Sequence, residues 1–230
     1  MKRYDIILLD ADNTLFDFDR AEHEALKKAM TERGYVFTEE SEQVYLSINR
    51  ALWESFDRGE ADQKWLVVER FRRLDAALGG SNDPEAFNRD YLTYLGQGAY
   101  LLPGALELCR ELKAAGCTVA LATNGVARVQ HARMDTSPLR EFIDGLFISE
   151  ELGAQKPQAE FFEPMLSALH VTDLSRCLMV GDNLRSDILG GINAGVDTVW
   201  FNPHRKPNPT DILPTYTVEN YTQLKELIFS

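Results

Sequence analysis

Cysteine is scarce in this chain of 230 residues, which contains only Cys109, Cys117 and Cys177. An odd number of cysteines without a Cys-x-x-Cys pair argues against a disulfide framework and against a zinc knuckle. We therefore expect all three to be thiols buried in the core.

Long apolar runs are also missing, because no stretch approaches the roughly 18 residues that a membrane-spanning helix needs. The N-terminus reaches a carboxylate at Asp5, which is too early for a secretion signal. With 44% hydrophobic and 10% aromatic residues, the chain has enough apolar material for a sizeable core. These features predict a soluble, cytoplasmic protein.

Basic residues are in the minority, with 24 Lys and Arg against 36 Asp and Glu and a formal net charge of −12. A nucleic-acid groove needs clustered Lys and Arg, and a membrane-surface helix needs a cationic face. The four histidines are scattered without metal-ligand spacing, which argues against a transition-metal site. We expect a small-molecule partner, no nucleic acid polymer, no membrane, and a monomer or weak homodimer.

Five short apolar runs divide the chain and lack the polar alternation of a half-exposed sheet. They cover residues 4–9, 118–122, 146–148, 176–180 and 198–201. Stretches with helical spacing lie between them, for example 104–115 and 160–169. This alternation predicts an α/β fold, a doubly wound parallel sheet with right-handed crossovers.

The gap between the first two runs is too long for an ordinary crossover, since it holds about 108 residues where a dozen or more suffice. Residues 16–98 have helical spacing almost throughout, with breaks at glycines such as Gly34 and Gly59. We predict a Rossmann-like catalytic core formed by 1–15 and 99–230 and an inserted helical cap domain at 16–98. The cap is expected above the carboxyl end of the first strand.

Polar residues follow the strands at the edge where open α/β sheets bind their ligands. The segments concerned are Asp10-Ala11-Asp12-Asn13-Thr14, Thr123-Asn124-Gly125, Lys156-Pro157 and Gly181-Asp182 with Asp187 beyond it. If these strands are neighbours, four carboxylates and one ammonium converge, and like charges at close range repel strongly. A divalent cation with oxygen ligands relieves this repulsion, and Mg²⁺ fits.

Each of these residues also has a purely structural interpretation. Thr123-Asn124-Gly125 precedes a predicted helix at 126–134 and so offers an anion cradle, but Thr123 or Asn124 could serve only as an N-cap. Lys156 could be an ordinary surface lysine, and Asp187 could be an acid in the first turn of a helix. Their shared position at one sheet edge favours the functional interpretation for all of them together. Arg128, Arg133 and Arg205 could reach a substrate, but a solvated surface position is the favoured interpretation of each.

Taken in order, the segments above resemble the four motifs of the haloacid dehalogenase-like hydrolase superfamily. Order, spacing and strand context agree over essentially the whole chain. The resemblance implies that Asp10 attacks a phosphoryl group to form an aspartyl-phosphate, and that Asp12 serves as general acid and then general base. It also implies Mg²⁺ held by Asp10, the backbone carbonyl of Asp12 and Asp182, with Asp187 in the outer shell or bound through water.

The resemblance further implies that Thr123, Asn124 with the neighbouring amides, and Lys156 hold the phosphate oxygens. Side chains two residues apart at a strand end project to the same side, so Asp10 and Asp12 can flank one phosphorus. Crowding by other carboxylates would favour the protonated Asp12 that acid catalysis needs. The dehalogenase branch of the superfamily typically lacks the second aspartate, so the presence of Asp12 favours phosphate-monoester hydrolysis. A mutase activity remains an alternative.

The inserted segment 46–53 and nearby aromatic residues resemble the cap of bacterial pyrimidine 5′-nucleotidases. Tyr45, Asn49, Trp53 and Phe56 fall on roughly one helical face, where rings could stack on a base and Asn49 could read its edge. The alternative is that these aromatics pack the core of the lobe. A 5′-nucleotidase for pyrimidine monophosphates is thus predicted, with two alternatives: a broad sugar-phosphate phosphatase and a non-catalytic phosphate-binding interaction module.

Overall fold

The computed structural model describes residues 2–229 and consists of two compact units. Unit 1 contains the residues up to Phe18 and those from Ala99 onward, and unit 2 contains Asp19–Gly98. Within unit 1, the two segments that lead to and from the insertion are paired. The amide of Asp17 donates to the carbonyl of Tyr100, and the amide of Leu102 donates to the carbonyl of Leu15, both at 2.9 Å.

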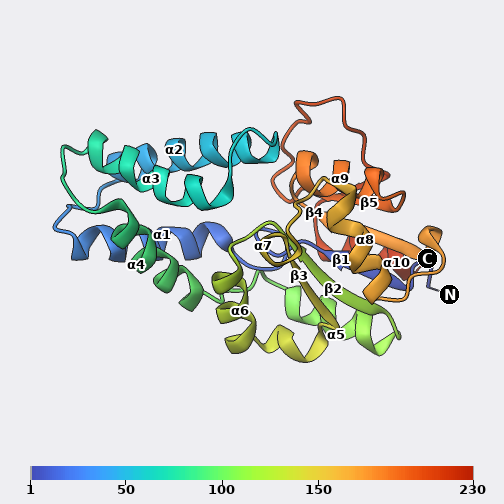
Figure 1. The fold of residues 1–230 in the computed structure, drawn as a ribbon. Helices are drawn as coiled ribbons and strands as arrows, with labels where there is room; N and C mark the ends of the chain where they lie inside the picture. The colour runs from blue at the N-terminus through green and yellow to red at the C-terminus, as the bar shows by residue number, and fades with distance from the viewer. Residues whose placement is uncertain (1, 230) are drawn as a thin grey trace. The chain divides into compact units, whose positions relative to one another are not determined.

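Unit 1 is built on a six-stranded sheet in the order β3-β2-β1-β4-β5-β6, in which every neighbouring pair is parallel (Figure 1). The strands are β1 (Ile6–Leu9), β2 (Thr118–Thr123), β3 (Gly145–Ile148), β4 (Cys177–Gly181), β5 (Asp197–Phe201) and β6 (Tyr216–Val218). The predicted doubly wound α/β fold is confirmed.

Helices cover both faces of this sheet. They are α5 (Ala105–Ala114), α6 (Ala127–Thr136), α7 (Ser149–Leu152), α8 (Ala159–Ala168), α9 (Leu189–Asn193) and α10 (Tyr221–Phe229), with short 3₁₀ segments at Pro138–Phe142 and Leu174–Arg176 and a π-helical turn, η3, at Leu184–Ile188. Successive strand residues point to opposite faces. Ile7 and Leu9 of β1 pack in one apolar cluster with α5 and α10, whereas Leu8 packs in another with α8.

The sequence-based strands lie within about two residues of β1 to β5, but β6 and α10 were not anticipated. Strand β6 has three residues, of which only Val218 is buried, so it carries neither the length nor the apolar run on which the prediction depended. The three cysteines are free and buried, as expected. Burial raises the pKa of Cys109 to about 12, which keeps its thiol protonated.

Unit 2 is helical: it contains α2 (Glu39–Asp57), α3 (Gln63–Ala77), α4 (Pro84–Gln97) and nearly all of α1 (Phe18–Glu32). The side chains of Thr38, Asp62 and Asp83 accept hydrogen bonds from the first-turn amides of α2, α3 and α4, respectively. Phe71 lies at the centre of its aromatic core, with ring centroids 4.4 Å from Phe87 and 5.2 Å from Tyr91.

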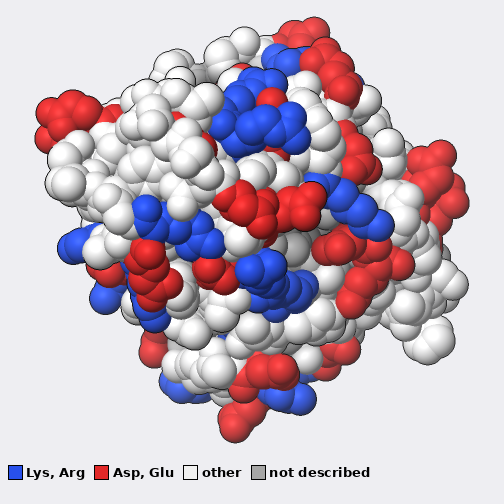
Figure 2. Space-filling model, turned by 60° about the vertical axis from the view of Figure 1, so that its left-hand side comes forward, with Lys and Arg blue, Asp and Glu red and all other residues white. Residues whose placement is uncertain are grey.

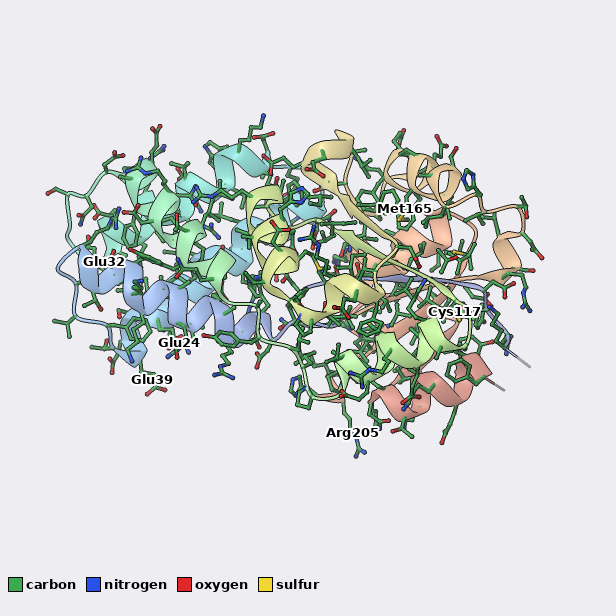
Figure 3. All side chains as sticks on the ribbon, turned by 90° about the horizontal axis from the view of Figure 1, so that it is seen from below. Glu24, Glu32, Glu39, Cys117, Met165 and Arg205 are labelled. Carbon is green, nitrogen blue, oxygen red and sulfur yellow. The ribbon has the colours of Figure 1, made fainter. Side chains whose placement is uncertain are left out.

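Many, though not all, of the charged side chains of the helices lie on the outside. Figure 3 shows Glu24 and Glu32 of α1 and Glu39 of α2 pointing away from the helical core, whereas Cys117 and Met165 lie in the interior of unit 1. On the face drawn in Figure 2, acidic and basic side chains lie next to one another in small groups. Among residues 2–229, every helix is too short or too polar to cross a bilayer.

Candidate active site

The strand order brings three of the predicted segments to one edge of the sheet. Strand β1 lies between β2 and β4, and the register pairs Leu9 with both Leu121 and Val180. The three strands therefore end at nearly the same level, and the residues that follow them meet there. The amide of Asp10 continues the ladder by donating to the carbonyl of Val180 at 2.9 Å.

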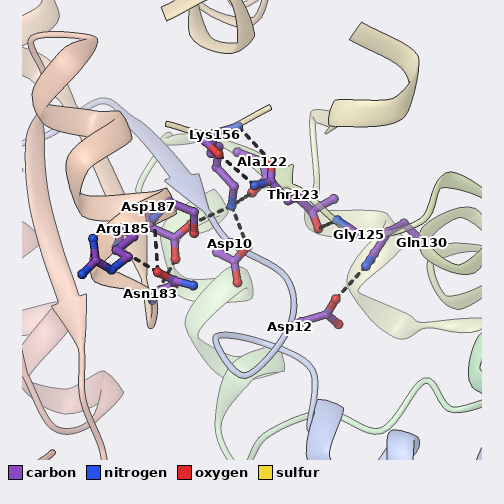
Figure 4. A network of polar contacts seen from close by, with 12 residues as sticks. Asp10, Asp12, Ala122, Thr123, Gly125, Gln130, Lys156, Asn183, Arg185 and Asp187 are labelled. Carbon is purple, nitrogen blue, oxygen red and sulfur yellow. Dashed lines mark hydrogen bonds and ion pairs between the residues drawn. The ribbon is translucent and has the colours of Figure 1, made fainter. Parts of the chain in front are cut away.

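The carboxylates of Asp10 and Asp187 meet at this edge around one buried ammonium, that of Lys156 (Figure 4). Asp10, Asp182 and Asp187 each offer one carboxylate oxygen, and these oxygens all lie within 4.8 Å of one another. Lys156 Nζ donates to Asp10 Oδ1 at 2.7 Å, to Asp187 Oδ1 at 2.6 Å and to the carbonyl of Ala122 at 2.6 Å. Lys156 is 1% exposed, so three negative groups face a single buried positive one.

The chain following β4 is shaped to bring Asp187 back to the strand end. The side chain of Asn183 accepts from the amides of Arg185 and Ser186, which starts the π-helical turn η3 that carries Asp187. The amide of Asn183 donates to Asp187 Oδ2 at 3.0 Å. A Cβ on Gly181 would lie 2.2 Å from the same oxygen. Glycine is therefore required at 181 for this approach, and π-helical turns are frequent at functional sites.

Burial and crowding determine the electrostatics of the cluster. Burial raises the pKa of Asp10 to about 7, with Lys156 opposing the shift and Asp187 adding to it. Burial, followed by repulsion from Asp10 and Asp187, also raises the pKa of the half-buried Asp182 well above its ordinary value, while Lys206 and Lys156 act against the shift. Burial alone lowers the pKa of Lys156, but attraction by the two carboxylates outweighs it and raises that pKa.

This donor set fits a magnesium ion. All three side chains offer hard carboxylate oxygens, and Mg²⁺ binds through one or two carboxylates, water and substrate phosphate. Burial, and after it repulsion from neighbouring carboxylates, raises the pKa of Asp10 and of Asp182, so their charged forms are costly without a further positive charge. A divalent cation would supply that charge.

Neither Thr123, the last residue of β2, nor Asn124, which follows it, caps a helix. Thr123 is buried and its hydroxyl oxygen accepts from the amide of Gly125 at 2.9 Å, so the hydroxyl proton is available to donate. Asn124 pairs with the backbone of Lys156: its Nδ2 donates to the Lys156 carbonyl and its Oδ1 accepts from the Lys156 amide, both at 2.9 Å. The N-cap of α6 is instead Val126, without a side-chain cap.

The carboxyl group of Asp12 lies outside the cluster of three carboxylates and faces α6. Gln130 Nε2 donates to Asp12 Oδ2 at 2.9 Å, and Arg133 Nη1 donates to Asp12 Oδ1 (Figure 4 shows the Gln130 contact). The expectation that Arg133 is a solvated surface residue was wrong, since it is 0% exposed. Crowding by carboxylates, expected around Asp12, acts mainly on Asp10 and Asp182.

Comparison with known proteins agrees with this geometry. A family model described as haloacid dehalogenase-like hydrolase matches residues 4–195. The chain belongs to the haloacid dehalogenase-like hydrolase family.

Individual relatives of this hydrolase cover nearly the whole chain. It is 36% identical to the pyrimidine 5′-nucleotidase PynA of Streptococcus pneumoniae, over 98% of this chain and 95% of that protein. It is 35% identical to the pyrimidine 5′-nucleotidase YjjG of Escherichia coli, over 98% of each. The crystal structure of the HAD-hydrolase YfnB of Bacillus subtilis, bound to magnesium, superposes with a TM-score of 0.93, 33% identity and 99% coverage of both chains.

Two supporting residues of the hydrolase were missed in the sequence. Trp200 Nε1 donates to the backbone carbonyl of Asp182 at 2.9 Å, and the hydroxyl of Tyr221 donates to the carbonyl of Thr14 at 2.6 Å. Both side chains come from β5 and α10, more than ten residues from the groups they hold. Gln130 and Arg133 could have been found from the sequence. They lie three residues apart, and so on one face, of the helix that follows the second motif.

Unit 2 contains a second buried polar network, built around Arg70 and Glu22. Arg70 donates to Asn49 Oδ1 at 3.2 Å and to Asn88 Oδ1 at 3.1 Å, and Asn49 Nδ2 donates to Glu22 Oε1 at 2.8 Å. Both ends of the Asn49 amide are thus engaged inside the lobe, which favours the core-packing alternative for this face. Trp53 is half-buried, with its ring edge-on to Phe56 at 5.3 Å. Base recognition by Asn49 and Trp53 stays a prediction.

Proposed function

We propose that this hydrolase is a Mg²⁺-dependent phosphate-monoester hydrolase that acts on pyrimidine nucleoside 5′-monophosphates. The observation that carries the proposal is the meeting of Asp10 with Asp182, Asp187 and Lys156 at one sheet edge. The two relatives named as pyrimidine 5′-nucleotidases support the substrate class, since they match this chain over nearly its full length.

Asp10 is the proposed nucleophile. Lys156 holds its Oδ1, and the other carboxylate oxygen attacks the phosphorus of the ester. The bond between phosphorus and the ester oxygen then breaks, leaving an aspartyl-phosphate and an alkoxide. Asp12 gives its proton to that alkoxide, which departs as the nucleoside.

The second step returns Asp10 to its starting state. Asp12, now a carboxylate, takes a proton from a water whose oxygen attacks the aspartyl-phosphate. The bond between phosphorus and Asp10 breaks, and inorganic phosphate leaves. The net reaction converts one ester and one water into one nucleoside and one phosphate.

The remaining residues hold the phosphate and the cation. In this proposal the hydroxyl of Thr123 and the neighbouring backbone amides bind phosphoryl oxygens, and the ammonium of Lys156, which donates to Asp10, Asp187 and the Ala122 carbonyl, supplies positive charge beside them. Asn124 fixes the backbone of Lys156. Asp10, the carbonyl of Asp12 and Asp182 would hold Mg²⁺, with Asp187 in the outer shell. When bound, Mg²⁺ neutralises negative charge on the nucleophile and on the phosphate.

We assign recognition of the leaving group to unit 2, as the cap, with Trp53 offering a ring for stacking. Loss of a single base-stacking ring costs roughly 1–3 kcal/mol. Trp53→Ala should therefore raise KM for a nucleotide by about tenfold or more and leave KM for p-nitrophenyl phosphate nearly unchanged. Equal effects on both substrates would remove Trp53 from nucleotide recognition.

A substrate screen with added Mg²⁺ tests the proposed function. The purified protein is assayed against UMP, dUMP and dTMP and against hexose phosphates, with p-nitrophenyl phosphate as a general probe and EDTA as the metal-free control. Preference for the nucleotides supports the proposal, and preference for hexose phosphates replaces the substrate class. Absence of Mg²⁺-dependent hydrolysis of every ester would instead favour a non-catalytic phosphate-binding module.

A further inference from the structure

Asp12 is held by two side chains of one helix that none of the sequence motifs includes. Gln130 and Arg133 lie at positions i and i+3 of α6, so they project from the same face. Gln130 donates to one carboxylate oxygen of Asp12 and Arg133 to the other. The plane of the Asp12 carboxyl group is thereby fixed by two donors.

Both donors are buried, which distinguishes them from chance surface contacts. Gln130 is 1% exposed and Arg133 is 0% exposed. Burying a guanidinium is expensive unless it is paired, and Asp12 is the carboxylate with which Arg133 forms an ion pair. The guanidinium also lies 5.8 Å from the ring centroid of Phe16 and 5.5 Å from that of Phe18, which restricts where it can move.

The turn before α6 is shaped around this arrangement. A Cβ on Gly125 would lie 2.2 Å from Gln130 Nε2 and 3.1 Å from Thr123 Oγ1. A larger residue at 125 would displace the Gln130 side chain from Asp12. The same segment, 123–133, therefore supplies the proposed phosphate cradle at one end and the partners of Asp12 at the other.

We propose that Gln130 and Arg133 are positioning residues that orient Asp12 for proton transfer, an inference that rests on the proposed function. Each carboxyl oxygen has two lone-pair directions, so one oxygen can carry a proton while both donors stay in place. That proton moves to the ester oxygen as the bond between phosphorus and this oxygen breaks. The attacking water later returns a proton to the same carboxylate.

The test compares two leaving groups, because an acid matters most where the leaving group needs a proton. Release of leaving group in the first turnover is measured by rapid mixing with Mg²⁺, using UMP, or the best alkyl phosphate of the screen, and p-nitrophenyl phosphate. The variants are Arg133→Met, Gln130→Met and Arg133→Lys. Arg140→Met is the matched control, since Arg140 is 66% exposed and pairs only with Asp135 among the contacts described.

Arg133→Met should slow release from the alkyl ester by roughly 30- to 100-fold and from p-nitrophenyl phosphate by less than about threefold, within the range of acid catalysis. KM should change by less than about threefold. Gln130→Met should give a smaller loss of about fivefold to tenfold with the same selectivity, and Arg133→Lys should recover part of the rate. Arg140→Met should match the parent on both substrates.

Equal losses on both substrates, a change confined to KM, or unchanged rates would overturn the inference. If Arg133→Met does not fold, Gln130→Met decides the question, because it removes no buried charge. A parent protein that hydrolyses neither ester would contradict the proposed function itself. An active parent whose variants lose both substrates equally would contradict only the positioning role.

Discussion

Both units bury charged side chains, but they balance them differently. In unit 2, one carboxylate, Glu22, is buried near one guanidinium, Arg70, and Asn49 bridges the two. In unit 1, three carboxylates meet one buried ammonium, Lys156. The first set holds one carboxylate and one guanidinium joined through hydrogen bonds, whereas the second has more carboxylates than cations.

The difference separates a structural network from a functional one. Buried charges that are paired and hydrogen-bonded contribute specificity to a fold, and breaking them is costly. An unbalanced group of carboxylates at the end of a parallel sheet destabilises the protein without its cation, and such arrangements cluster at functional sites. We therefore expect loss of the buried cation Arg70 to destabilise unit 2, and loss of one clustered carboxylate to stabilise unit 1 when no divalent cation is bound.

The largest effect should come from Asp10→Asn. This substitution removes the proposed nucleophile, so Mg²⁺-dependent hydrolysis of p-nitrophenyl phosphate should fall by at least about 10⁴-fold. The fold should persist, because the change relieves repulsion in the cluster. Circular dichroism and thermal unfolding provide the control, and near-parental hydrolysis by a folded variant would refute the assignment.

Arg70→Met should destabilise unit 2 by about 3–5 kcal/mol, since it leaves Glu22 buried without its cation. Urea unfolding can be followed by the fluorescence of Trp53 and Trp65 in a Trp200→Phe background, because those two tryptophans lie in unit 2. Arg72→Met is the matched control, as the Arg72 side chain is 61% exposed. It should change stability by less than about 1 kcal/mol. Similar losses in both variants would contradict the comparison.

Glu22 should make the stability of unit 2 depend on pH. Burial, against the pull of Arg70, raises the pKa of Glu22 from 4.5 to about 7 in the folded protein. The folded state therefore binds the proton more tightly than the unfolded state. The resulting stabilisation is complete below pH 4.5 and is lost as the pH rises through about 7, by up to roughly 3 kcal/mol.

The Glu22→Gln variant should lack this contribution. Its stability relative to the parent should therefore improve between pH 4.5 and 7.5, measured by the same urea assay. Glu24→Gln, at an exposed position of the same helix, should keep the parental pH dependence. A Glu22→Gln variant that follows the parent at every pH would show that Glu22 does not titrate in this range.

The position of the site was predictable because it depends on strand ends. One apolar run ends directly before Asp10 and another is separated from Asp182 by one residue, and parallel strands of an open sheet bring such residues to one edge. Asp187 follows only five residues after Asp182, so the sequence also keeps it near this edge. Side-chain partners were less accessible, since Asn124 reaches the backbone of Lys156 across 32 residues of sequence.

The wrong expectation for Arg133 has a physical reason. Helix α6 has ten residues, and its buried positions are Val129, Gln130, Arg133 and Met134. Half of its inward face is polar because it faces a carboxylate rather than an apolar core. A helix whose polar residues point inward cannot be oriented from its hydrophobic periodicity.

The central claim is that Asp10 and Asp182 hold one divalent cation, with Asp187 in its outer shell. Thermal unfolding of the parent and Asp182→Asn in EDTA and in excess Mg²⁺ tests it most directly. In EDTA, Asp182→Asn should be more stable than the parent by about 1–2 kcal/mol, because one crowded carboxylate is gone. Mg²⁺ should stabilise the parent, by about 2.7 kcal/mol at 100 times its Kd, and the variant far less. A parent that Mg²⁺ leaves unchanged, together with a variant less stable than the parent in EDTA, would contradict the claim.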